Sequence, residues 1–166
     1  MSSRRLEDLT PEMELLARRF IKECEAEDFD VLIYCTYRSP EEQAVEYCKG
    51  RNQDDIKGGI DKLISLGMDD MAKILGEAIP NKRARESTKA PPGLSCHQHG
   101  LAFDGCPMVN GRCLWDTKAK SSQRLWARYG LIAENCGLNW SGYWTSFREY
   151  PHCQMRGELM ELIKPK

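Results

Sequence analysis

The sequence predicts an α+β fold with a small, mainly antiparallel sheet and flanking helices. Several segments carry apolar residues at helical spacing and begin with strong capping signals. Between them lie short runs rich in β-branched and aromatic residues, as in strands. An Asn-Gly pair at residues 110–111 stands between two such runs. This pair predicts a tight hairpin turn, which joins neighbouring antiparallel strands.

The size and charge of the chain limit what it can be. It has 166 residues, of which 41% are hydrophobic and 30% charged, and its net charge is −1. This length is typical of one domain with its own core. A chain without net positive charge offers no broad field for nucleic acid or an anionic membrane. We therefore expect a single domain over residues 1–166, monomeric, with no nucleic-acid partner and no stable membrane insertion.

The first helix and first strand have clear signals. Thr10 is a suitable N-cap, Pro11 suits the first helical position, and apolar residues then recur from Met13 to Cys24. Residues 31–37 (VLIYCTY) read as a strand.

A second helix should follow this strand directly. Ser39 is a capping residue and Glu42, three positions later, completes a capping box, while Gly50 ends the helix. Arg38 is therefore fixed at a strand-to-helix corner, where functional side chains are common.

Residues 51–94 look like an insertion into this domain. Apolar residues recur at helical spacing from Ile60 to Ala78, with an interruption at Gly67. Residues 81–93 are polar and locally basic, so we expect an exposed, solvated loop. We expect no second core here.

The last third returns to strands and one long helix. The Asn-Gly turn joins residues 106–109 to 112–115, after a strand that begins near Leu101. A helix is predicted over 123–135, an aromatic strand over 140–154, and a short helix over 157–162.

Eight cysteines occur without any C-x-x-C pair. This spacing does not fit a cysteine-based zinc module, so we expect reduced and mostly buried thiols. The alternative is a disulfide between Cys106 and Cys113, across the turn, in an oxidising compartment.

All three histidines fall in two short segments, residues 95–104 (SCHQHGLAFD) and 149–154 (EYPHCQ). A catalytic zinc takes three protein ligands, from imidazole and carboxylate among others, and leaves a fourth position open. His97, Asp104 and His152 supply such a set, with Asp104 on a strand. Gly100 would let the backbone pass close to the metal. The sequence thus predicts a zinc site.

Glu149 lies three residues before His152, so a regular strand would turn the two side chains in opposite directions. We therefore expect a bend at Tyr150-Pro151 that brings both to the metal. A carboxylate beside a zinc ion is the general base that a hydrolase needs.

The two segments read S-x-H-x-x-G-x-A-x-D and E-x-x-H, and residues 37–43 read YRSPEEQ. Together they resemble the zinc D,D- and L,D-peptidases of peptidase family M15. Residues 137–154 are most similar to the phage branch, the L-alanyl-D-glutamate endolysins. The resemblance covers residues 31–49 and 95–155 and implies a Hedgehog/D,D-peptidase-like fold.

The resemblance also implies roles for single residues. His97, Asp104 and His152 would be the metal ligands and Glu149 the catalytic acid/base. Arg38 would bind a substrate carboxylate or steady the oxyanion. Further substrate contacts are expected from Ser95, Gln43 and Trp144, whereas His99 is expected beside the ligands rather than among them.

The expected function is therefore zinc-dependent hydrolysis of an amide bond in peptidoglycan stem peptides, for host cell lysis. One alternative is a D-alanyl-D-alanine carboxypeptidase or dipeptidase of the same superfamily, and another is a non-catalytic binding module that retains zinc. The charged segment MSSRRLEDLTPEM is unlike a secretory signal. We expect the protein in the host cytoplasm after synthesis, and at the cell wall after release.

Overall fold

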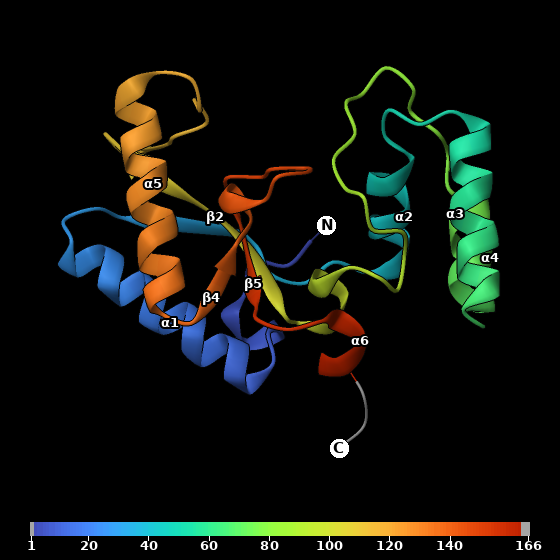
Figure 1. The fold of residues 1–166 in the computed structure, drawn as a ribbon, viewed down its shortest axis with the longest axis horizontal. Coiled ribbons are helices and arrows are strands. Elements are labelled where there is room, and N and C mark those ends of the chain that lie inside the picture. Colours follow the sequence, from blue (N-terminus) through green and yellow to red (C-terminus); the bar gives the residue numbers. More distant parts are fainter. Residues whose placement is uncertain (1, 164–166) are drawn as a thin grey trace. The chain divides into compact units, whose positions relative to one another are not determined.

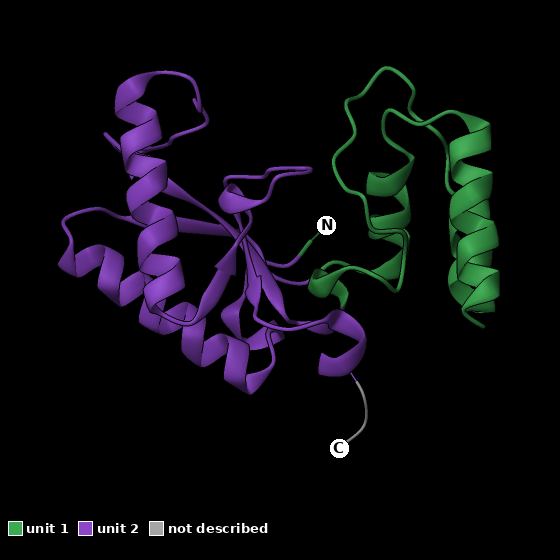
Figure 2. Ribbon diagram, in the orientation of Figure 1, with its two compact units in different colours: residues 1–2, 38–98 green, residues 3–37, 99–166 purple. Residues whose placement is uncertain are grey.

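The computed structural model describes residues 2–163 and divides the chain into two compact units (Figures 1 and 2). The sheet unit comprises residues 3–37 and 99–166, and the helical unit comprises residues 1–2 and 38–98. We expected one domain with an insertion at about 51–94. The helical unit begins at Arg38 and contains an apolar cluster that the sequence analysis did not expect, while the single domain over residues 1–166 stays a prediction.

The sheet unit contains a five-stranded sheet in the order β1-β2-β5-β4, with β3 paired to β2. Every pairing is antiparallel, as predicted. Its elements are η1 (Leu6–Asp8), α1 (Pro11–Ala26), β1 (Val31–Cys35), β2 (Ala102–Val109), β3 (Arg112–Cys113), α5 (Lys120–Asn135), β4 (Leu138–Trp140), η3 (Ser141–Tyr143), β5 (His152–Met155) and α6 (Leu159–Leu162).

Helices α1 and α5 pack together against the sheet (Figure 1). Phe20 of α1 lies between Phe103 of β2 and Tyr129 of α5, with ring centroids 5.5 and 4.9 Å away. Cys153 of β5 contacts the Tyr129 hydroxyl. Since side chains alternate along a strand, the neighbours of Phe103 and Cys153 point to the opposite face.

Several local predictions are confirmed. The Thr10 side chain caps α1 by accepting a hydrogen bond from the Met13 N–H at 3.3 Å. Asn110 and Gly111 both have positive φ, 52° and 73°, as the hairpin turn requires.

The predicted strand over 140–154 is wrong in its middle. The chain leaves β4 at Trp140, forms η3, and enters β5 only at His152. The aromatic residues that suggested a strand pack into a cluster instead. Trp140, for example, contacts the rings of Tyr143 and Tyr150 at 4.9 and 5.9 Å.

The helical unit contains α2 (Pro40–Cys48), α3 (Gln53–Ser65), α4 (Asp69–Glu77) and most of η2 (Cys96–His99). The capping box of Ser39 and Glu42 is present as predicted. A second box, formed by Asn52 and Asp55, starts α3 before the apolar pattern begins. The unit is held by a buried cluster from its three helices: Ala44, Tyr47, Cys48, Ile56, Leu63, Ala72 and Leu75.

Among residues 2–163, no helix combines the length and the apolar character that crossing a bilayer requires.

Candidate metal and catalytic site

Strand alternation and register bring Asp104 and His152 together. The two residues are directly opposite each other on β2 and β5. Their sequence neighbours Phe103 and Cys153 face the helices, so Asp104 and His152 point to the other face of the sheet. The Asp104 Oδ1 atom lies 3.1 Å from the His152 Nδ1 atom.

The His152 ring has an acceptor at each nitrogen. Its Nδ1 faces the Asp104 carboxylate, and its Nε2 lies 3.0 Å from the Gln154 Oε1 atom. A neutral imidazole has only one N–H to donate. If Nε2–H donates to Gln154, the Nδ1 lone pair faces the Asp104 carboxylate, an arrangement that suits a metal ion bound to both. In the other tautomer, Nδ1–H donates to Asp104 instead.

The donor set fits a zinc ion. Imidazole nitrogen and carboxylate oxygen are both usual zinc ligands, and two ligands about 2.1 Å from one tetrahedral ion lie about 3.4 Å apart. The 3.1 Å separation is close to that value. Gln154 matches the outer partner that normally orients a metal-binding histidine through its second nitrogen.

His97 and Ser95 belong to the helical unit, whereas Asp104 and His152 belong to the sheet unit. His97 and Ser95 are buried, with exposed fractions of 3% and 7%. His97 lies in η2, which ends at His99, and only Gly100 and Leu101 separate that residue from β2. A connection of two residues therefore joins η2, which contains His97, to β2, which contains Asp104. The role of His97 as a ligand stays a prediction.

Gly100 has a different role from the one expected. It adopts φ +64°, and a Cβ atom there would lie 2.9 Å from the Asp8 carbonyl oxygen and 3.0 Å from the Thr10 nitrogen. Its own carbonyl accepts a hydrogen bond from the Thr10 N–H at 2.9 Å. Gly100 is therefore needed for the close approach of the segment before α1.

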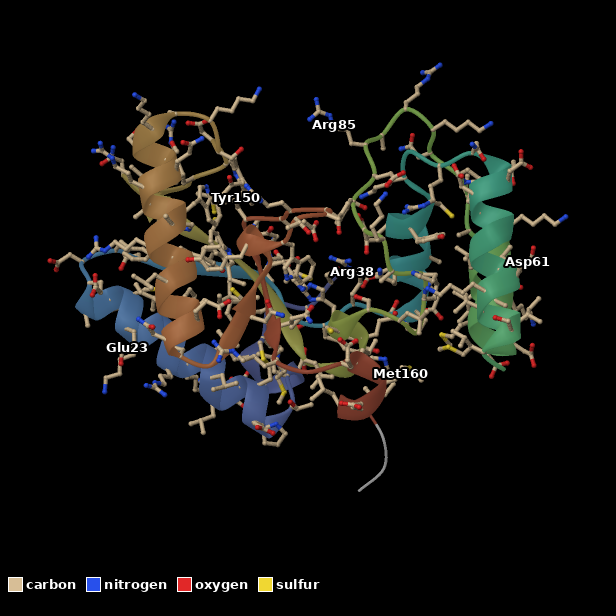
Figure 3. The ribbon with its side chains drawn as sticks, viewed as in Figure 1. Glu23, Arg38, Asp61, Arg85, Tyr150 and Met160 are labelled. Carbon is tan, nitrogen blue, oxygen red and sulfur yellow. The ribbon has the colours of Figure 1, made fainter. Side chains whose placement is uncertain are left out.

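Glu149 lies just before the bend at Tyr150 and Pro151, and that bend is as predicted. The Pro151 carbonyl accepts a hydrogen bond from the Gly105 N–H at 3.0 Å, which ties the bend to β2 beside Asp104. Tyr150, labelled in Figure 3, packs against Trp126 of α5 with ring centroids 5.7 Å apart, and both residues belong to the sheet unit.

Trp144 stands beside the candidate ligands. Its ring centroid is 5.6 Å from that of His152, and its indole N–H donates to the Asn139 Oδ1 atom at 3.3 Å. Trp144 is half-buried, so one part of the ring remains available to a bound peptide.

Arg38 and Gln43 lie together in the helical unit. The Arg38 guanidinium donates to the Gln43 Oε1 atom at 2.9 Å, and the Gln43 amide donates to the Ala90 carbonyl at 2.8 Å. Gln43 is fully buried. A contact of Gln43 with substrate stays a prediction, and the structure shows in addition that this residue accepts a hydrogen bond from Arg38.

Sequence reasoning missed Tyr34 and Cys35. The β1–β2 register is irregular here, since Ile33 pairs with Gly105 and Cys35 with the adjacent Asp104. Such a bulge turns side chains to a new direction. The Cys35 thiol and the Asp104 carboxylate lie within 4.8 Å of each other. Burial, with a smaller contribution from Asp104, raises the pKa of Tyr34. No pattern in the sequence VLIYCTY predicts this bulge.

All eight cysteines are free thiols, and six of them are buried. The expectation of mostly buried cysteines is confirmed, while their reduced state stays a prediction. Burial raises the pKa of Cys96, next to His97, to about 11.

Comparison with known proteins gives a consistent picture. Residues 88–155 match the model of an M15 peptidase family described as D-alanyl-D-alanine carboxypeptidase. The peptidoglycan L-alanyl-D-glutamate endopeptidase CwlK of Bacillus subtilis is 33% identical over 78 residues, which cover 45% of this chain and 47% of CwlK. The chain thus matches about half the length of this curated relative.

Solved structures share the fold. The L-Ala D-Glu endopeptidase ChiX of Serratia marcescens matches with a TM-score of 0.52 and 14% identity, over 94% of this chain and 89% of that one. The vancomycin resistance D,D-pentapeptidase VanY, solved with Zn(II), matches with a TM-score of 0.52 and 16% identity, over 90% of this chain and 73% of that one. The α+β fold of the D,D-peptidase class is thereby confirmed.

Proposed function

We propose that this chain, whose residues 88–155 match an M15 peptidase family model, is a zinc-dependent peptidase acting on peptidoglycan stem peptides. The bond we propose is that between L-alanine and D-glutamate, the linkage named for both CwlK and ChiX. The observation that carries the proposal is the Asp104–His152 pair, a carboxylate oxygen and an imidazole nitrogen 3.1 Å apart, a separation that suits two ligands of one zinc ion.

We propose His97 as the third ligand, since η2 leads into β2 through only two residues. Zinc, when bound, would supply Lewis acidity to the scissile amide. Gln154 would hold the His152 ring in the orientation that directs Nδ1 to the ion, through the contact at Nε2.

Glu149 is the proposed acid/base. Its carboxylate would take the proton from the attacking water and return it to the leaving amine, so that the residue ends each cycle unchanged. Arg38, fixed by Gln43, would bind a substrate carboxylate through its planar fork of donors. Ser95 would hydrogen-bond substrate or a ligand, and Trp144 would form a wall of the binding surface.

Metal analysis combined with a wall-digestion assay tests the proposal. Purified protein should carry about one zinc per chain, and a chelator should remove both the metal and the digestion of purified sacculi. Glu149→Gln should keep the zinc and lose at least about a hundredfold in rate, a typical value for loss of acid–base catalysis. Undiminished digestion in the chelator, or by Glu149→Gln, would refute the proposal.

The products distinguish the alternatives. An L-alanyl-D-glutamate endopeptidase exposes new amino groups on glutamate, whereas a carboxypeptidase releases free D-alanine. The family model's description favours the second activity and the relative CwlK the first. A binding module would retain zinc and release neither product.

We further propose a role in host cell lysis, as a phage endolysin, with release to the wall through a separate helper in the inner membrane. This rests on the resemblance of residues 137–154 to the phage branch. Expression within a bacterium, with and without a pore-forming protein, tests it. Lysis is expected only when both are present.

A further inference from the structure

The backbone around Glu149 is fixed by an unusual set of side-chain hydrogen bonds. The segment from Glu149 to Pro151 lies outside helix and strand. Even so, its carbonyls accept bonds from buried side chains. Ser141 donates to Glu149, the Trp140 indole N–H donates to Tyr150 at 2.7 Å, and the Tyr129 hydroxyl donates to Pro151 at 3.0 Å.

The donors come from three elements of the sheet unit: Tyr129 from α5, Trp140 from β4 and Ser141 from η3. Their exposed fractions are 0%, 3% and 0%. A buried donor that loses its acceptor costs about 1–3 kcal/mol. The segment therefore cannot shift without leaving several buried donors unsatisfied at once.

The Trp140 donor is itself held rigidly. Gly130 of α5 and Gly142 of η3 both touch its ring, and a Cβ atom at either glycine would overlap the indole carbons. The two glycines leave space for the indole ring, and the close contacts on both of them restrict its orientation. The direction of the indole N–H is therefore fixed.

The backbone just before the segment carries strain. Phe147 has a φ of 51°, in the left-handed region that bulky residues rarely adopt. Such a conformation persists where the surrounding structure determines it and is often found at functional sites.

We propose that Tyr129, Trp140 and Ser141 act as positioning residues that hold Glu149 for proton transfer, an inference that rests on the proposed function. We call this set the carbonyl clamp. The clamp fixes the position of the Glu149 main chain, from which the catalytic carboxylate extends. The three clamp residues need not contact the substrate to have this effect. A misplacement of about 1 Å at a catalytic group can cost about a hundredfold in rate.

The clamp predicts a graded series of effects. Ser141 holds the carbonyl of Glu149 itself, so Ser141→Ala should have a large effect. Trp140→Phe removes the bond one residue further along. Tyr129→Phe should have the smallest effect, because the Pro151 carbonyl keeps its bond from the Gly105 N–H at 3.0 Å.

Steady-state kinetics on a soluble stem peptide test this series. We expect kcat to fall about tenfold in Ser141→Ala and Trp140→Phe and less in Tyr129→Phe, with KM unchanged and zinc retained in Trp140→Phe and Tyr129→Phe. The Ser141 hydroxyl also donates to the His152 carbonyl at 3.1 Å, so the kcat of Ser141→Ala is compared at full zinc loading. Ser122→Ala is the matched control. Ser122 is also buried, at 7% exposure, and its hydroxyl donates to the Asp116 Oδ2 atom at 2.7 Å rather than to a carbonyl of residues 149–151. It should lose stability but keep its kcat.

A second readout does not depend on activity. The Trp140 indole proton should exchange slowly with solvent in the zinc-loaded protein, as seen by NMR. If the wild type cleaves no stem peptide but this proton is protected, the proposed function fails and the clamp geometry stands. If the proton exchanges freely, or if Ser141→Ala retains the kcat of Ser122→Ala, the clamp is overturned. Should Trp140→Phe not fold, Ser141→Ala decides alone.

Discussion

At the scale of single residues, the site depends on which atoms face each other across β2 and β5. The sequence predicted Asp104 on a strand, and alternation explains why it and His152 share a face. The contact of Gln154 with His152 could not be predicted, because a residue two positions along a strand shares a face in any sheet but contacts its neighbour only in some rotamers. The bulge at Tyr34 and Cys35 could not be predicted either, because it arises from pairing with a strand that is distant in the sequence.

Removal of the Gln154 side chain should weaken zinc binding without removing a ligand. Gln154→Ala frees the Nε2 of His152 from its 3.0 Å contact, so the ring can rotate. Loss of such an outer partner typically costs about 10–100-fold in metal affinity. Competition with a chromophoric chelator measures this. Gln123→Ala, on α5, is the matched control, and equal zinc affinities in both variants would contradict the orienting role.

Gln43 should act on substrate binding through Arg38. Gln43→Leu removes the acceptor of the 2.9 Å bond from Arg38 and the donor to Ala90. We expect a loss of about 1–3 kcal/mol in unfolding free energy, because buried polar groups lose their partners. We also expect KM to rise with zinc content unchanged. Gln43→Glu keeps the acceptor and should recover KM in part, and a KM equal to the wild type in Gln43→Leu would exclude the coupling.

At the scale of elements, capping signals were more informative than apolar patterns. The caps at Thr10 and Ser39 were read correctly because they are local: each involves atoms within three residues. The apolar pattern missed the start of α3, where Asn52 and Asp55 form a box ahead of the first apolar stripe. The strand expected over 140–154 failed because aromatic residues suit both a strand and a packed cluster, and only tertiary contacts decide between them.

The link between η2 and β2 gives an element-scale prediction. Gly100→Ala places a Cβ atom 2.9 Å from the Asp8 carbonyl and forces a left-handed backbone on alanine. We expect the unfolding free energy to fall by more than about 1 kcal/mol, the usual cost of that conformation alone. Urea denaturation measures it.

Gly58→Ala supplies the control for Gly100. Gly58 lies inside α3, and the position that a Cβ atom would take there has open space around it, with no neighbour within 4 Å. Alanine there should stabilise the protein by about 0.5–1 kcal/mol, since glycine is costly within a helix. If both substitutions change stability alike, the close approach at Gly100 is not the reason for its glycine.

At the scale of the whole molecule, the buried thiols make stability depend on alkaline pH. Burial raises the pKa of Cys24, Cys48 and Cys136 above the ordinary value of 9.0. Below pH 9 both folded and unfolded chains hold these protons. Above it the unfolded chain loses them first, so the unfolding free energy should fall as the pH rises.

Denaturation of the reduced protein at pH 7, 9 and 10 measures this slope. Cys24→Ala removes one of the buried thiols, and its unfolding free energy should fall less steeply than that of the wild type between pH 9 and 10. An identical slope in the two proteins would show that these thiols do not couple to folding. Comparing variants at the same pH removes the contribution of lysine and tyrosine, which titrate in both.

The division into two compact units was not foreseen from the sequence, although the expectation of one domain stays a prediction. Residues 51–94 read as an insertion, yet the helical unit also takes in α2, whose Ala44, Tyr47 and Cys48 complete its apolar cluster. Composition cannot reveal this, because the boundary at Arg38 falls inside a well-signalled strand-to-helix connection. The family-matched segment, in turn, draws on both units.

The placement of the helical unit between β1 and β2 has a consequence for biosynthesis. These strands pair with each other although residues 36–101 separate them, so their ladder closes a long loop, an entropic cost that grows with the number of intervening residues. The strand that carries His152 emerges from the ribosome later still. A growing chain can therefore bring Asp104 and His152 together only after every element that precedes β5 has been made, so the proposed site is among the last features of this fold to form.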